Sequence, residues 1–121
     1  MPTNRATGVA LATIPDTSDT SEAIDFRTFA GAGVYAPAAF DGTEVSVEVS
    51  TGYVADATTF DESDFIWTVL TDSAGVPVPA VPLAAEGSAN LPSEVFPWPW
   101  FRLVSDVNQS GGCVLEIVRK G

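Results

Sequence analysis

Histidine is absent from the sequence and cysteine occurs once, so two residue types on which many active sites depend are missing or nearly so. Without histidine the chain lacks the usual general base, the usual zinc ligand and the usual member of a nucleophilic triad. It contains no GxSxG motif either. The composition therefore predicts a protein that is not an enzyme and that carries no cofactor. A hydrolase with two paired carboxylates is the enzymatic alternative, because such enzymes need no histidine.

Basic residues are also scarce: five of them face sixteen acidic residues, and the net charge is −11. Nucleic acids and anionic membranes are bound by cationic surfaces that release counterions, so the charge balance argues against both as partners. A basic protein surface, a divalent cation and plain solubility remain open. Solubility is the first explanation for most of this charge.

The sequence has no apolar run long enough to span a membrane and no secretory signal pattern near its start. Residues 1–5 are typical of a cytosolic start. The single Cys113 cannot form an internal disulfide, and it stands in the apolar run Cys113-Val114-Leu115. A buried thiol is therefore expected there, and not a reactive one.

What the sequence does contain is a series of short strand patterns separated by turn signals. Residues 43–50 are the clearest case, because Val45, Val47 and Val49 alternate with polar residues. Residues 65–70 (FIWTVL) are apolar on both faces, which predicts a central or doubly covered strand. Other strands are predicted at residues 9–14, 22–29, 34–36, 76–81, 102–105 and 114–118, with a loop at residues 84–90.

No segment shows the sustained 3.6-residue apolar period of a helix, and no internal repeat occurs. The pattern of seven or eight short strands predicts an all-β fold, a single antiparallel β-sandwich of jelly-roll or immunoglobulin-like type. We assign residues 21–121 to this sandwich domain. Residues 1–20 form an N-terminal arm or edge strand with a linker, and the sequence leaves open whether they pack on the domain.

An aromatic segment, residues 94–105 (EVFPWPWFRLVS), contains Trp98 and Trp100. Pro97 and Pro99 have no N–H to donate, which predicts a strand with a blunted edge or an extended lead-in to one. On a strand the two indoles would face the same way. The two tryptophans are assigned first to the core, second to a protein interface, and third to a platform that stacks on sugar rings.

The candidate metal site is an acidic cluster, because calcium takes several oxygen ligands. Its members are Asp56, Asp61, Glu62 and Asp64. The segment lacks the glycine and the regular alternation of a known calcium-binding loop. A solvated loop is the preferred interpretation, and no metal is predicted.

Residues 21–26 (SEAIDF) followed by residues 37–42 (PAAFDG) resemble the start of a group of small head-region proteins of tailed phages and prophages. In that group a SEAIDL strand leads to a PAAW or PAAF turn and an amphipathic strand. Residues 67–78 (WTVLTDSAGVPV) look like the group's strand–turn–strand hairpin, and residues 100–105 and 114–120 are similar to its last two strands. The resemblance is a loose pattern, and residues 53–64 depart from it with an acidic segment in place of a DG..Y hairpin.

The resemblance implies a structural virion protein: a capsid decoration or cement protein, or a related head or neck component. It implies binding over junctions of the major capsid protein as a homotrimer, on the capsid surface, after assembly in the host cytoplasm. An arm that adds a strand to a neighbour suits such a protein. The alternative function is a carbohydrate-binding or fibre module. The interface candidates come from the arm and the aromatic segment: Val9, Leu11, Ile14, Phe96, Trp98 and Trp100.

Overall fold

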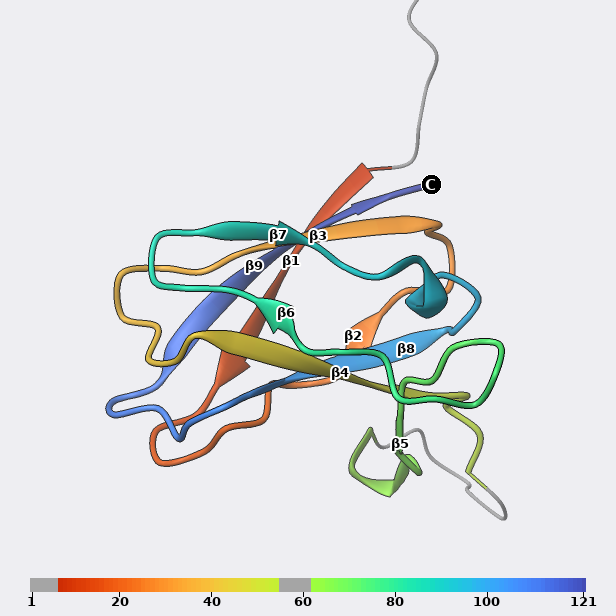
Figure 1. The fold of residues 1–121 in the computed structure, drawn as a ribbon, viewed down its shortest axis with the longest axis horizontal. Helices are drawn as coiled ribbons and strands as arrows, with labels where there is room; N and C mark the ends of the chain where they lie inside the picture. Colours follow the sequence, from red (N-terminus) through yellow and green to blue (C-terminus); the bar gives the residue numbers. More distant parts are fainter. Residues whose placement is uncertain (1–6, 55–61) are drawn as a thin grey trace, which may run out of the picture.

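The computed structural model describes residues 7–54 and 62–121 as two antiparallel β-sheets packed face to face (Figure 1). The first sheet has the order β1-β9-β3-β7. The second has the order β2-β8-β4-β5, and β6 pairs with β4. The predicted all-β class and antiparallel β-sandwich are confirmed. The strands are β1 (Thr7–Ile14), β2 (Ile24–Asp25), β3 (Gly31–Tyr35), β4 (Glu44–Ser50), β5 (Thr68–Val69), β6 (Val81–Pro82), β7 (Ser88–Asn90), β8 (Trp100–Ser105) and β9 (Cys113–Lys120).

The core lies between the sheets and is built from alternate residues of the long strands. Val45, Val47 and Val49 of β4 are buried, as their alternation predicts. Within this core the rings of Phe26, just after β2, and Phe101 of β8 meet edge to face with centroids 5.5 Å apart. Cys113 is buried, as predicted.

The N-terminal strand β1 pairs with β9 along its whole length, from Thr7 opposite Lys120 to Ile14 opposite Cys113. In Figure 1 the two strands, red and blue, run side by side. The segment after β1 is tied to the domain as well, because the Thr17 N–H donates to the Gln109 carbonyl at 2.9 Å. Residues 7–20 therefore pack on the sandwich in this structure.

The predicted central strand at residues 65–70 is wrong. Only β5 (Thr68–Val69) is a strand, and it lies at the edge of the second sheet with both residues exposed. The apolar character on both sides of the segment has another cause. Leu70 enters the core, whereas Phe65 and Trp67 pack beside Trp100 on the outer face of the second sheet. Ile66 is left 81% exposed.

The aromatic segment is not extended before Trp100. A 3₁₀ helix, η2 (Ser93–Val95), is followed by a turn in which the Trp98 N–H donates to the Val95 carbonyl at 3.0 Å. The strand expected at residues 102–105 is present within β8. At residues 76–81 a continuous strand is likewise missing from the structure, and the prediction of a loop at residues 84–90 overlooked β7. Edge strands of two or three residues are too short to show a recognisable alternation in the sequence.

One buried amide joins three turns at one end of the sandwich. The Gln109 side chain is 1% exposed, accepts from the Asp41 N–H at 2.8 Å and donates to the Asp41 carbonyl at 2.7 Å. Its backbone N–H donates to the Ser18 carbonyl at 2.9 Å. The turns after β1, before β4 and between β8 and β9 are thereby held in one position.

We predict that Gln109→Ala lowers the free energy of unfolding by about 2–4 kcal/mol, because it leaves the Asp41 N–H without its partner and the Asp41 carbonyl with only the Ser105 hydroxyl, and it empties the buried space of the side chain. Urea denaturation measures the change. Asn108→Ala alters the exposed neighbouring residue and should leave stability nearly unchanged. Equal stabilities for the two variants would contradict the assigned role of Gln109.

Candidate functional site

Large apolar side chains gather on the outer face of the first sheet, which we call the apolar face. The register places Val9 opposite Val118, and Leu11 and Tyr35 both opposite Glu116, so these side chains share one side of the sheet. Val9 and Leu11 are 63% and 65% exposed. The exposed residues that define the face are Val9, Leu11, Tyr35, Val114 and Val118.

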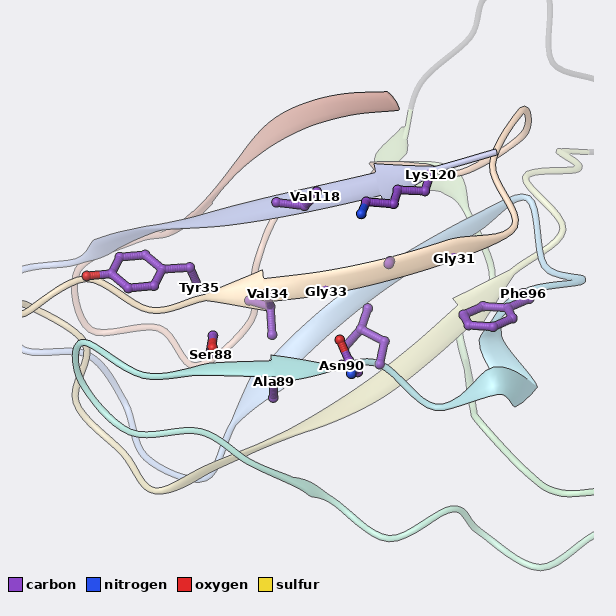
Figure 2. A pocket seen from close by; sticks show the side chains of 12 residues that line it. Gly31, Gly33, Val34, Tyr35, Ser88, Ala89, Asn90, Phe96, Val118 and Lys120 are labelled. Carbon is purple, nitrogen blue, oxygen red and sulfur yellow. The ribbon is translucent and has the colours of Figure 1, made fainter. Parts of the chain in front are cut away.

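A groove of about 810 Å³ continues the apolar face across β3 and β7 (Figure 2). Its floor contains Gly31 and Gly33, whose outward positions carry no side chain. A Cβ placed at Gly33 would lie 3.4 Å from the Ala89 carbonyl oxygen and 3.6 Å from Asn90 Oδ1, and would fill part of the hollow. The hollow therefore exists because these two residues are glycine. In Figure 2, Tyr35 and Phe96 stand at opposite ends of the groove.

Polar groups border the same groove. Ser88 and Asn90 of β7 line one side, and Lys120 of β9 lines the other. Within the described ranges 7–54 and 62–121, Lys120 is the one basic side chain that makes no ion pair or hydrogen bond. The ammonium group of Lys120, the amide of Asn90 and the hydroxyl of Ser88 therefore border the groove, together with exposed aromatic and aliphatic side chains.

The other basic side chains of the described chain are each held by an aromatic ring and an oxygen acceptor. Arg102 lies 4.5 Å from the Trp67 ring centroid and pairs with Glu48 at 2.6 Å. Arg119 lies 4.4 Å from the Phe29 ring centroid, and its Nη1 donates to a backbone carbonyl at 2.7 Å. The guanidinium groups of Arg102 and Arg119 are thus engaged within the domain.

The aromatic candidates do not form an exposed platform. Phe96 and Trp98 are half-buried and pack against the main core. Trp100 points outward from β8 but is only 5% exposed, because Phe65 covers it with ring centroids 5.1 Å apart. The expectation that Trp98 and Trp100 face the same way fails, since Trp98 lies in the turn before the strand.

Gly52 lies in the loop that follows β4, and it allows this loop to approach Trp100 closely. Its backbone has φ +72°, and a Cβ there would lie 2.6 Å from the indole ring. Arg27 adds a cation–π contact at 5.1 Å from the Trp100 centroid. This second aromatic cluster was missed in the sequence because its members come from separate segments.

The interface candidates of the N-terminal strand divide between two environments. Val9 and Leu11 lie on the apolar face, but Ile14 is fully buried in the core. The alternation of β1 imposes this division, because residues at odd positions point outward and those at even positions point inward. Tyr35, Val114 and Val118 were not singled out in the sequence, although the alternation of residues 114–118 was visible.

Of the candidate metal ligands, Asp56 and Asp61 lie outside the described residues. Glu62 and Asp64 are exposed in a 3₁₀ helix, η1 (Glu62–Asp64). The part of the chain that the structure describes contains no group of three or more potential metal ligands. Calcium binding therefore gains no support from the described residues.

Several carboxylates have lowered pKa values because they accept hydrogen bonds in their ionised form. The backbone N–H and hydroxyl of Ser110 lower the pKa of Asp41, and those of Thr43 lower the pKa of Asp106. The pKa of Asp25 is lowered chiefly by its hydrogen bond from Arg27. Burial raises the pKa of the Cys113 thiol. These shifts belong to turns and strand ends, and none of the groups lines the groove.

In the regions 7–54 and 62–121, no helix is long and apolar enough to cross a membrane. Comparison of the chain with protein-family models, with curated proteins and with solved structures finds no match. The resemblance to phage head-region proteins, and the partner and assembly it implies, accordingly stay predictions.

We predict that acid destabilises the fold as the pH falls below about 4, the ordinary range for an aspartate in an unfolded chain. The folded-state pKa values of Asp41 and Asp106 are lowered, so their contribution is complete above that range and is lost as the pH falls through the folded pKa. Thermal unfolding measured from pH 7 to pH 2 tests this. The double variant Asp41→Asn, Asp106→Asn should unfold at lower temperature at pH 7 and respond less to acid.

The variant Glu116→Gln is the control for the loss of a negative charge. Glu116 is exposed and lies in the middle of β9, outside the turns that contain Asp41 and Asp106. An acid response of the double variant as steep as that of the unchanged protein would contradict the prediction.

Proposed function

We propose that this protein is a structural virion component, a capsid decoration protein that binds over junctions of the major capsid protein and stabilises the phage head. The observation that carries the proposal is the apolar face, a row of exposed aliphatic side chains on one sheet of an otherwise acidic domain. Exposed apolar patches on soluble proteins commonly mark interaction surfaces. The resemblance to phage head-region proteins names the partner.

The two surfaces of the sandwich support attachment through the first sheet. The outer face of the second sheet is covered around Trp100 by Phe65 and bears the Glu48–Arg102 ion pair. The outer face of the first sheet bears no such cover among residues 7–54 and 62–121. Burying its aliphatic side chains against a partner would gain roughly 25 cal/mol for each Å² removed from water.

A decoration protein that spans two capsid subunits stabilises the shell by mass action. It binds the assembled state and not the separated subunits, so assembly gains RT ln(1 + [L]/Kd), about 2.7 kcal/mol when the free protein is at 100 times its Kd. This role needs no catalytic group. The net charge of −11 suits a basic region of the shell, and attachment should therefore be slower at high salt.

The homotrimer that the resemblance implies is a separate prediction, because the apolar face does not set the number of copies. The second candidate function, a carbohydrate-binding module, is favoured by the groove and not by Trp98 and Trp100. An aromatic ring, an amide and an ammonium group, from Tyr35, Asn90 and Lys120, border the same hollow.

We predict that Val118→Glu weakens binding to shells of the major capsid protein of the virus that encodes this chain by about tenfold or more, since burying an unpaired charge costs over ~1.4 kcal/mol. Co-sedimentation with shells that lack the decoration protein measures the binding. Val107→Glu is the matched control, because Val107 and Val118 are 43% and 39% exposed and Val107 lies in a turn outside the apolar face.

Equal binding of Val118→Glu and Val107→Glu to the shells would show that the apolar face is not the attachment surface. Asn90→Ala separates the two functions, because it should leave shell binding unchanged and would weaken the binding of a sugar in the groove. Failure of the unchanged protein to bind such shells would overturn the proposed function.

A further inference from the structure

The strand β1 (Thr7–Ile14) forms one edge of the first sheet, with β9 on one side and no described strand on the other. Thr13 shows which way its backbone groups point. The Thr13 N–H donates to Glu22 Oε1 at 2.9 Å, and the Thr13 carbonyl accepts from the Glu22 N–H at 3.1 Å. Both groups of Thr13 therefore point away from β9, toward the edge.

In an antiparallel strand the N–H and C=O groups of one residue point to the same side, and the side alternates along the strand. Thr7, Val9 and Leu11 stand at alternate positions of β1 counted from Thr13, so their backbone groups point toward the same edge as those of Thr13. Glu22 occupies this edge only at Thr13. As far as the described ranges 7–54 and 62–121 go, three residues of β1 thus have ladder donors and acceptors that no other strand pairs.

This edge differs from the others in the described structure. The remaining edge strands, β2, β5, β6 and β7, have only two or three residues each, and β6 contains Pro82. The strand β1 has eight residues, TGVALATI, with no proline and no charge. Proteins ordinarily protect long edges with proline, charge or a bulge, because an open edge pairs with another chain.

We infer that β1 pairs antiparallel with β1 of a second copy of this chain and joins two sandwiches through one continuous sheet. The segment is self-complementary: with the two-fold axis at Val9, Thr7 of one copy lies opposite Leu11 of the other, and all of the free backbone groups are used. Glu22 blocks registers that extend through Thr13. The inference goes beyond the proposed function, because it concerns self-association and not attachment to a shell.

The charge on the chain bears on this pairing. Two copies that each carry −11 repel one another, but β1 itself contributes no charged side chain to the contact. Added salt screens the repulsion, with a Debye length of about 8 Å at 0.15 M. The dimer should therefore become tighter as salt is added, which is the opposite of the salt response expected for attachment to a basic shell.

Sedimentation equilibrium of the full chain over a wide concentration range tests the inference. We expect a monomer–dimer equilibrium that shifts toward dimer in salt. Amide hydrogen exchange followed by NMR supplies the signature of the edge: the Val9 and Leu11 N–H groups should exchange quickly in dilute monomer and slowly in dimer. The Ala10 and Ala12 N–H groups point toward β9 and should be protected in both states.

Two variants act on the edge in different ways. Leu11→Pro removes an N–H that points outward and spares the β1–β9 ladder, so the dimer should be lost while the fold is kept. Val9→Glu places two carboxylates across the two-fold axis and should weaken the dimer by about tenfold or more. Val118→Glu is the matched control, because Val118 lies directly opposite Val9 on β9, one strand inside the edge.

In solution without shells, a monomer at all concentrations, or a trimer, would overturn the inference; the homotrimer that the resemblance implies concerns copies bound to the capsid. It would also be overturned by a dimer that Val9→Glu and Val118→Glu weaken equally, or by one that leaves the Val9 and Leu11 amides unprotected, since both results indicate contact through the apolar face. If Leu11→Pro unfolds the chain, Val9→Glu and the exchange pattern still decide the question.

Discussion

The fold depends on the way a single buried amide connects turns that are far apart in the sequence. Gln109 holds the backbone of Asp41 from both sides and is tied to the segment that follows β1. Three of the five strands of the second sheet have only two residues each, so much of the backbone there is satisfied by such turn contacts and not by ladders. An amide suits this position because it donates and accepts at once and brings no charge into the interior. The apolar face and the free edge are both positioned by strands that these turns orient.

The described basic residues show how a very acidic chain uses its few cations. Arg27, Arg102 and Arg119 each lie over an aromatic ring and bond an oxygen acceptor, so they contribute packing area as well as charge. Lys120 is the exception in the described chain and stands beside the groove. On the apolar face, exposed apolar side chains lie around the exposed carboxylate of Glu116. This concentration of exposed apolar side chains distinguishes the candidate attachment surface.

Sequence patterns, alternation in residues 43–50 and β-branched residues in 114–118, predicted two of the long strands of the structure. Residues 43–50 and 114–118 formed strands, and Val45, Val47 and Val49 were correctly placed in the core. Residues 65–70 misled because Phe65 and Trp67 are covered by side chains on the outside of a sheet and not by a second layer of strands. The groove was not predictable, since it depends on two glycines of β3 lying beside β7, a three-residue strand in a segment whose small polar residues predict a loop.

The pairing of Thr7 with Lys120 has a mechanical consequence. Because the two residues lie opposite one another at the same end of an antiparallel pair, a force that pulls them apart loads one pair of backbone bonds at a time. The strands then separate like a zipper, at low force. A force directed along the strands in opposite directions would load all eight pairs together and meet far greater resistance. A shell component built on this sandwich would therefore withstand sideways strain within the sheet plane better than it withstands being peeled from its ends.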